Sequence, residues 1–193
     1  EWVGILETNT ASSILTEYSD VIQVFIPELK DSVIQQSLAS INRSLLNANI
    51  RMAILLKDIP NAKEILERLK YSGAEQTVIL GCIKQSTKSL TSKVELKQLL
   101  STLNIPFDIY HSYRYAIDKN YPKDTMLAYY HEIQDANEPY LLKHLAIDGN
   151  TIKGLGYQGK EIADILHACL DEVIHHPENN NNKILIDMIK RTH

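Results

Sequence analysis

The stretch "IKGLGYQGKEIADILHACLDEVI", residues Ile152–Ile174, decides the fold class of this chain. Three of the chain's seven glycines lie within Gly154–Gly159, and glycine is costly in regular structure unless the backbone needs it. The residues that follow place apolar side chains at helical spacing: Ile162, Ile165, Leu166, Cys169, Leu170 and Val173. Such a stripe faces the core when a helix forms. The stretch therefore predicts a glycine turn that leads directly into a long amphipathic helix.

Helical patterns recur in four further segments, at residues 60–73, 92–104, 122–137 and 183–193. Gly73 is predicted to end the first of these helices, and Ser92 and Glu95 have capping-box spacing at the start of the second. Only Asp20–Leu29 has a strand-like pattern, and it lacks a partner hairpin. The asparagines of Pro177–Lys183 favour an exposed loop before the last helix. We therefore predict an all-α array of short helices joined by short loops.

The composition is that of an ordinary soluble globular protein of 193 residues, with 44% apolar and 23% charged residues. The net charge of −4, from 20 basic and 24 acidic residues, does not suggest a basic nucleic-acid binder. Cys82 and Cys169 lack metal or redox spacing, which predicts reduced core thiols in a cytoplasmic protein. Apolar runs such as Met52–Leu56 are too short to span a membrane. Glu1 in place of Met predicts either a piece of a longer protein or a processed product.

The segment "MAILLKDIP", Met52–Pro60, resembles the metal-binding segment of HD-type domains, where an adjacent His–Asp pair holds a metal that activates water. Lys57 stands where that histidine would be, and all seven histidines of the chain follow Asp58. A protonated lysine is not an ordinary metal ligand. One of the adjacent His175 and His176 is expected to cap helix carbonyls and the other to meet solvent. The sequence also lacks nucleophile and phosphate-loop motifs, so we predict no catalytic residue and no metal site.

Aromatic and cationic residues gather in "IYHSYRYAIDKNY", which contains Tyr110, His111, Tyr113, Arg114, Tyr115 and Tyr121. Aromatics interleaved with cations can stack on the bases of RNA. Tyr110 and Tyr113, however, are three residues apart, which on a helix puts them on one face. Core packing is therefore favoured over base stacking.

The glycine turn itself allows two interpretations. A GxxG ahead of a helix exposes backbone N–H groups at the positive end of the helix dipole, where a phosphate can bind, and Lys153 and Lys160 flank the turn. Alternatively the glycines are structural: Gly154 or Gly156 adopts a left-handed conformation, and Gly159 permits close helix–helix approach. The local residues leave both interpretations open.

The wider segment Leu145–Ile186 resembles the tail of bacterial CCA-adding enzymes, the tRNA nucleotidyltransferases, which are related to bacterial poly(A) polymerases. The matching residues are Leu145, Ile147, Gly149, Ile152, Gly156, Gly159, Ile162 and Ala163, followed by the loop Asn179–Asn182. Thr151 departs from the usual Asp of the family, and Lys160 lies near the position of its Pro. Two weaker likenesses follow the same order, in Glu1–Leu29 to the family's neck helices and in Met52–Ile79 to its HD-like body.

The resemblance implies a curved neck–body–tail arrangement, with neck helices in residues 1–30, a body with a degenerate HD-like segment in residues 31–137 and a tRNA-elbow-binding tail in residues 138–193. It implies that the partners are tRNA and a catalytic head in the same polypeptide, which would use Mg, CTP and ATP. The Asp-x-Asp pair of that head is absent from this sequence, so this part alone would not be an enzyme. The residues expected to contact RNA are Lys153, Gly156, Tyr157, Gly159 and Lys160.

Other interpretations remain. "GLGYQGKEIA" also resembles the hairpin of helix-hairpin-helix modules that grip DNA backbone, although Lys160 occupies the position of the usual Ala. A non-catalytic helical interaction or regulatory domain is a third interpretation, and a metal-dependent phosphohydrolase is a distant fourth. The resemblance leaves open whether the whole protein adds CCA, CC, A or a poly(A) tail, because the head determines that choice.

Overall fold

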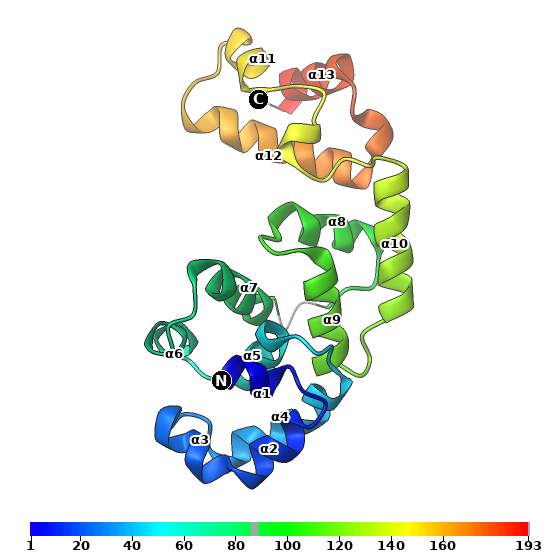
Figure 1. Cartoon of the computed structure of the whole chain (residues 1–193). Coiled ribbons are helices and arrows are strands. Elements are labelled where there is room, and N and C mark those ends of the chain that lie inside the picture. The colour runs from blue at the N-terminus through cyan, green and yellow to red at the C-terminus, as the bar shows by residue number, and fades with distance from the viewer. Residues whose placement is uncertain (86–88, 193) are drawn as a thin grey trace. The chain divides into compact units, whose positions relative to one another are not determined.

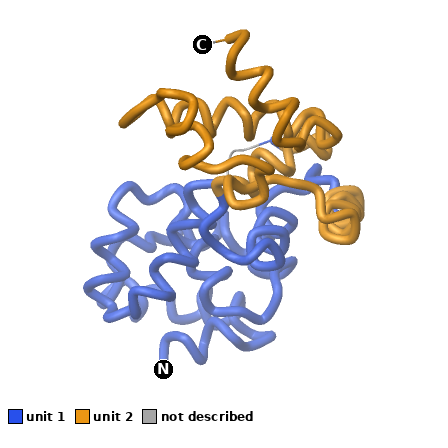
Figure 2. Tube along the Cα trace, turned by 90° about the horizontal axis from the view of Figure 1, so that it is seen from above, with its two compact units in different colours: residues 1–89, 103–123 blue, residues 90–102, 124–193 orange. Residues whose placement is uncertain are grey.

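The computed structural model describes residues 1–85 and 89–192, and it confirms the predicted all-α class (Figure 1). Thirteen α-helices, two short 3-10 helices and no strand occur in this described part. The strand-like stretch after Asp20 is helical, since it falls mostly in α3. The chain forms two compact units, residues 1–89 with 103–123 and residues 90–102 with 124–193 (Figure 2).

The expected neck, body and tail regions stay a prediction, and residues 86–88 of the body and 193 of the tail lie outside the described residues. The first unit contains α1 (Trp2–Leu6), α2 (Ala11–Glu17), α3 (Ser19–Phe25), α4 (Asp31–Arg43), α5 (Ala48–Leu56), α6 (Ala62–Arg68), α7 (Gly73–Lys84) and α9 (Phe107–Ile117). The second contains α8 (Lys93–Thr102), α10 (Lys123–Asp135, from Asp124 on), α11 (Gly149–Gly154), α12 (Lys160–His175), α13 (Asn182–Thr192) and the 3-10 turns η1 (Leu142–His144) and η2 (Pro177–Asn179).

Helix α5 is the centre of the first unit. It is apolar on nearly every face, and such a helix must be buried on all sides. Eight of its nine residues are buried, and α1, α4, α7 and α9 pack around it. The apolar run Met52–Leu56 is therefore a core helix. Within residues 1–85 and 89–192, no helix has both the length and the apolar character needed to cross a membrane.

One polar side chain is buried in this core helix. Arg51 is only 4% exposed, and its guanidinium joins α5 to the end of α1. Its Nη1 donates to the carbonyl oxygens of Leu6, at 2.7 Å, and Thr8, at 2.6 Å. Its Nε donates to Oγ of Ser44 at 3.0 Å. Burial lowers the pKa of Arg51, but these three acceptors satisfy the cation.

The aromatic cluster of α9 packs into the core of the first unit, as predicted. Tyr110 and Tyr113 are fully buried, and Tyr121 lies close by at 5% exposure. His111 Nδ1 lies 3.0 Å from the hydroxyl of Tyr121. Base stacking would require open ring faces, so these buried tyrosines are core residues. Tyr115 is the exception at 38% exposure.

The prediction that Gly73 ends the preceding helix is wrong. Helix α6 ends earlier, and Lys70 takes the left-handed conformation at φ 62°. The N–H of Tyr71 donates to the carbonyl of Leu66 at 3.0 Å, which is a Schellman motif. Gly73 instead begins α7, where Ser72 is the N-cap of a complete capping box. The end of α6 could not be predicted from the sequence, because lysine occupies the left-handed position where glycine is usual.

Replacing Lys70 by glycine should therefore stabilise the protein by about 0.5–1 kcal/mol, because glycine removes the cost of the left-handed conformation. The measurement is the urea midpoint of unfolding at constant m-value. Lys70→Ala is the control, since it removes the same side chain but keeps the Cβ, and it should give no gain. Equal stability of the two variants would contradict the prediction.

In the second unit, a cluster of buried side chains holds the last three helices together. The members are Ile147, Ile152, Ile165, Cys169, Val173, Leu185 and Ile189. The predicted stripe of α12 thus faces the core, and the predicted last helix is present as α13.

The predicted capping box at the start of α8 is also confirmed. Ser92 Oγ accepts from the N–H of Glu95 at 3.2 Å, and the Glu95 carboxylate accepts from the N–H of Ser92 at 3.0 Å. Cys82 and Cys169 are buried free thiols, and burial raises the pKa of Cys82 to about 12.

The asparagine run is only partly the exposed loop that the sequence predicts. It lies between α12 and α13, but Asn180 is half-buried and its side chain joins a distant segment. Its Oδ1 accepts from the N–H of Ala146 at 2.8 Å, and its Nδ2 donates to the carbonyl of His144 at 2.9 Å. Asn179 donates to Glu172 at 2.7 Å. Asn180 therefore anchors the segment ahead of α11, and Asn179 ties the loop to α12.

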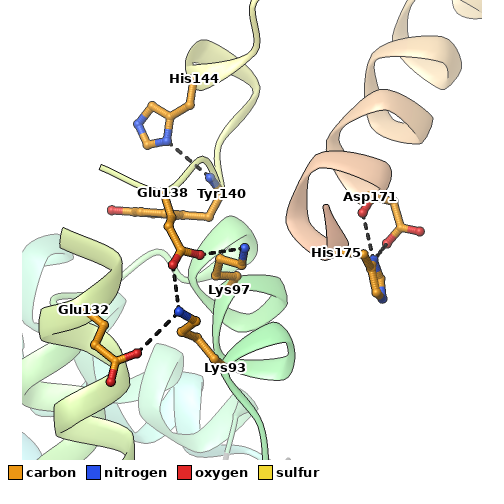
Figure 3. Close-up of polar contacts among 8 residues, drawn as sticks. All are labelled: Lys93, Lys97, Glu132, Glu138, Tyr140, His144, Asp171 and His175. Carbon is orange, nitrogen blue, oxygen red and sulfur yellow. Dashed lines mark hydrogen bonds and ion pairs between the residues drawn. The ribbon is translucent and has the colours of Figure 1, made fainter. Parts of the chain in front are cut away.

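A network of charged side chains joins α8 to α10 and to the segment that follows α10 in the same unit (Figure 3). Lys97 has a side chain only 2% exposed, and its Nζ lies 2.9 Å from Oε2 of Glu138. Lys93 approaches the other oxygen of the same carboxylate at 2.7 Å and also reaches Glu132 at 3.3 Å. Burial alone would raise the pKa of Glu138, but the hydrogen bonds from the two lysines outweigh it and hold that pKa below its usual value.

Candidate functional site

The five residues expected to contact RNA lie together on the α11–α12 connection of the second unit. Lys153 is in the last turn of α11, Gly156 and Tyr157 are in the loop, Gly159 is the N-cap of α12 and Lys160 is its first residue. All except Tyr157 are exposed. The structure therefore presents two lysines and two glycines at one solvent-facing turn.

Two glycines of this turn, Gly156 and Gly159, have positive φ angles. Gly156 has φ 104°, and its N–H donates to the carbonyl of Lys153 at 3.0 Å, which ends α11. Gly159 has φ 57° and ψ −126°, a conformation that is essentially restricted to glycine. The left-handed interpretation is thus confirmed for Gly156, whereas Gly154 is helical. The interpretation of Gly159 as a close-approach position is wrong, because a Cβ there would have no described heavy atom within 4 Å outside its chain neighbours.

Hydrogen bonds to carboxylate side chains support both helix starts around the turn. Asp148 is the N-cap of α11, and its Oδ1 accepts from the N–H and the hydroxyl of Thr151, each at 2.8 Å. These hydrogen bonds lower the pKa of Asp148. At α12, the N–H of Glu161 donates to the carbonyl of Gln158 at 3.2 Å, and the Glu161 carboxylate accepts from the N–H of Gln158 at 3.3 Å. The turn is therefore a defined structure before any ligand arrives.

Tyr157 serves mainly as an anchor. Its side chain is half-buried and packs against the hydrophobic cluster of the second unit, together with Leu155 and Ile162. A ring held in this way cannot swing out fully to stack on a base, although its remaining edge can contact a ligand. The two lysines are thus the strongest candidates for contact with an anion.

The charge around the turn limits what it can bind. The second unit contains eight Lys and Arg against twelve Asp and Glu, which gives 8 − 12 = −4. Glu161 lies in the first turn of α12, next to Lys160, and Asp164 is exposed on the same helix. The ammonium group of Lys160 at the N-terminal end of α12, with that of Lys153 in the last turn of α11, favours phosphate locally. The acidic surroundings make this basic strip narrow and its attraction sensitive to salt.

The segment Met52–Pro60, whose sequence resembles the metal-binding segment of HD-type domains, lies in the first unit. Lys57 follows the last residue of α5, and its ammonium forms an ion pair with the adjacent Asp58. In the described ranges, no three His, Cys, Asp or Glu side chains gather in a way that could hold a metal ion. His175 Nδ1 lies 2.8 Å from the carbonyl oxygen of Asp171 (Figure 3), so one of the adjacent pair caps a helix carbonyl, as predicted. The other, His176, is exposed.

Sequence reasoning missed an apolar surface on the first unit, formed by α1, α2 and α3. Phe25 is 67% exposed and Val24 is 75% exposed. The signal was present, because α3 has apolar residues on more than one face, and only one face can be buried against a single neighbour. The strand-like appearance of that stretch concealed it.

Comparisons with models of known protein families, with curated protein sequences and with solved structures found no match.

Proposed function

We propose that the chain is the tRNA-holding region of a tRNA nucleotidyltransferase, and that it helps to add or repair the 3′-terminal CCA of tRNA. The observation that carries the proposal is the conformation of Gly156 and Gly159. These are the glycines by which Leu145–Ile186 resembles the tail of that family, and both have backbone angles that favour glycine in one exposed turn. Lys153 and Lys160 stand at the two ends of this turn.

The proposal includes the finer features that the resemblance implies. These are a neck–body–tail arrangement, a degenerate HD-like segment with a packing role, and a cytoplasmic protein whose catalytic head uses Mg, CTP and ATP. This region would add no nucleotide by itself. Recognition of a tRNA elbow depends on shape and on the sugar–phosphate backbone, so a few cations at a rigid turn are sufficient for contact.

The proposed mechanism of holding is electrostatic. The ammonium groups of Lys153 and Lys160 would each approach a phosphate of the tRNA backbone, while Tyr157 keeps the turn fixed on the core. Each phosphate contact releases counterions, so every contact adds roughly 0.7–0.9 to the slope of log affinity against log salt. Two contacts predict a shallow slope and modest affinity, in keeping with the net charge of −4.

Lys153→Glu combined with Lys160→Glu should weaken the binding of whole tRNA by about tenfold or more, measured by electrophoretic mobility shift or anisotropy at low salt. Lys183→Glu with Lys190→Glu is the matched control, because it changes the net charge equally on exposed positions of α13. It should have a much smaller effect if the turn is the contact site.

Three results would contradict the proposal. Equal and very weak binding of whole tRNA and of an acceptor-stem minihelix would exclude elbow recognition. Duplex DNA that binds more tightly than tRNA would favour a helix-hairpin-helix module. An unchanged affinity after reversal of Lys153 and Lys160 would favour a domain that interacts with proteins.

A further inference from the structure

The first unit carries an apolar groove between its N-terminal helices. The groove has a volume of about 550 Å³, and its lining includes Trp2, Ile14, Tyr18, Val21, Phe25 and Leu69. Phe25 is 67% exposed, Val21 is 50% exposed and Tyr18 is 49% exposed. All of these residues belong to one unit. An aromatic and aliphatic surface of this kind, hollowed and open to solvent, is typical of an interaction site.

The groove is distinct from the core beneath it. Ile22 and Ile26 also line it, but they are 7% and 2% exposed and already contribute to the fold. The side chains at the mouth come from Tyr18, which joins α2 to α3, and from Val21 and Phe25 of α3, at intervals of three and four residues. Such a row of apolar side chains matches the spacing of anchor residues on a partner helix.

The charge around the groove is strongly one-sided. Residues 1–29 contain five acidic residues, which are Glu1, Glu7, Glu17, Asp20 and Glu28, and no lysine or arginine. Glu1 lines the groove, and the exposed Glu17 and Asp20 directly precede the lining residues Tyr18 and Val21. Among the nearby cations, Arg68 is already engaged with Glu28 at 2.6 Å, and Lys70 lies beyond Leu69.

We propose that this groove binds a basic amphipathic helix of a partner protein. Apolar side chains one turn apart on that helix would enter the groove beside Phe25 and Val21, and its lysines or arginines would meet the acidic residues Glu1, Glu17 and Asp20. The acidic residues around the groove favour a basic partner helix over a neutral or acidic one. A second copy of the chain would place two acidic rims against each other, and an anionic membrane would be repelled. This proposal does not depend on the proposed RNA contact, which lies in the other unit.

Trp2 provides a direct readout, because it lines the groove and is the only tryptophan of the chain. The probe is a synthetic, tryptophan-free helical peptide of about 15 residues, with Leu and Phe on one face and Lys on the other. A change in Trp2 fluorescence on titration into the full chain gives the affinity. The basic peptide should bind at least about tenfold more tightly than its charge-reversed Glu version and than a scrambled peptide without an apolar face.

Substitutions locate the binding surface. Phe25→Ser should weaken binding of the basic peptide by about tenfold or more, because it removes an exposed anchor contact. Leu45→Ser is the matched control, since Leu45 is 58% exposed in the same unit but does not line the groove, and it should leave the affinity unchanged. Glu17→Gln with Asp20→Asn should weaken binding several-fold and reduce its dependence on salt.

Several outcomes would overturn the proposal. If the unaltered chain bound the basic, charge-reversed and scrambled peptides equally, the proposal would be wrong. This test needs no variant, so it does not depend on whether the variants fold. Light scattering that shows a dimer abolished by Phe25→Ser would assign the groove to a second copy. Binding to phosphatidylcholine or phosphatidylserine vesicles that is lost in Phe25→Ser would assign it to a membrane surface. Unchanged peptide binding in Phe25→Ser would show that the groove is not the binding site.

Discussion

Glu138→Ala should lower the free energy of unfolding by about 3 kcal/mol, because it leaves the ammonium of Lys97 buried without its carboxylate. The Lys97 side chain is only 2% exposed, and its contact with Glu138 at 2.9 Å joins α8 to the segment after α10. Burial of an unpaired charge is far more costly than loss of a surface pair. Urea unfolding monitored by far-UV circular dichroism measures the change.

Two further variants isolate the cause. Glu132→Ala removes a carboxylate from the same network, but that side chain is 57% exposed, so the loss should stay below about 0.5 kcal/mol. Lys97→Met in the Glu138→Ala background removes the unpaired ammonium and should recover part of the lost stability. If Lys97→Met made the Glu138→Ala protein still less stable, the buried charge would not be the source of the effect.

The same contact predicts a pH dependence. The pKa of Glu138 is lowered in the folded protein, so its contribution to stability is present above the pKa of an unfolded glutamate, about 4.3, and is lost as the pH falls through the lower folded value. Glu138→Gln should show a smaller loss of stability between neutral and acidic pH than the unaltered protein. An identical loss in both proteins would contradict the assignment.

Arg51→Met should also destabilise the protein strongly, by about 3 kcal/mol, since it leaves the carbonyls of Leu6 and Thr8 without their buried donor. Arg68→Met is the matched control. Arg68 makes a bidentate pair with Glu28, but its side chain is 44% exposed, so its removal should cost about 1 kcal/mol or less.

A second readout tests the location of the Arg51 effect. Arg51 holds the end of α1, and Trp2 lies at the start of that helix. In Arg51→Met, the Trp2 fluorescence should therefore change at a lower urea concentration than the far-UV signal of the whole chain. Coincident transitions, or equal losses for Arg51→Met and Arg68→Met, would show that this arginine does not hold α1 in place.

Local features of the fold could be predicted from the sequence, and features that depend on distant partners could not. The stripe of α12 and the capping box at Ser92 and Glu95 follow from spacing within one helix. Lys97, by contrast, occupies an unremarkable position in its helix, and it is buried because Glu138 approaches from 41 residues away. In the sequence, Asn180 is indistinguishable from the rest of a polar loop, and only the structure shows its hydrogen bonds with Ala146 and His144.

The candidate site follows the same rule. A turn is local, so the position of Gly156 and Gly159 directly ahead of α12 could be predicted, and so could the left-handed conformation of one of them, whereas the short helix α11 was not predicted. The half-burial of Tyr157 could not, because it depends on the cluster formed by α11, α12 and α13. Contact of the turn with RNA remains a prediction, since the conformation of a backbone does not by itself identify a ligand.

The order of the chain through the two units has a consequence for dissection by truncation. The second unit takes residues 90–102 from the middle of the first, so the polypeptide passes between the units three times. A fragment that starts near residue 124 would lack α8, which packs against α12, and would leave that face of α12 uncovered. Loss of tRNA binding on deletion would then report an unfolded fragment rather than a missing contact. Only the whole chain, or a fragment in which a linker joins residues 90–102 directly to residues 124–193, can map activities to one unit.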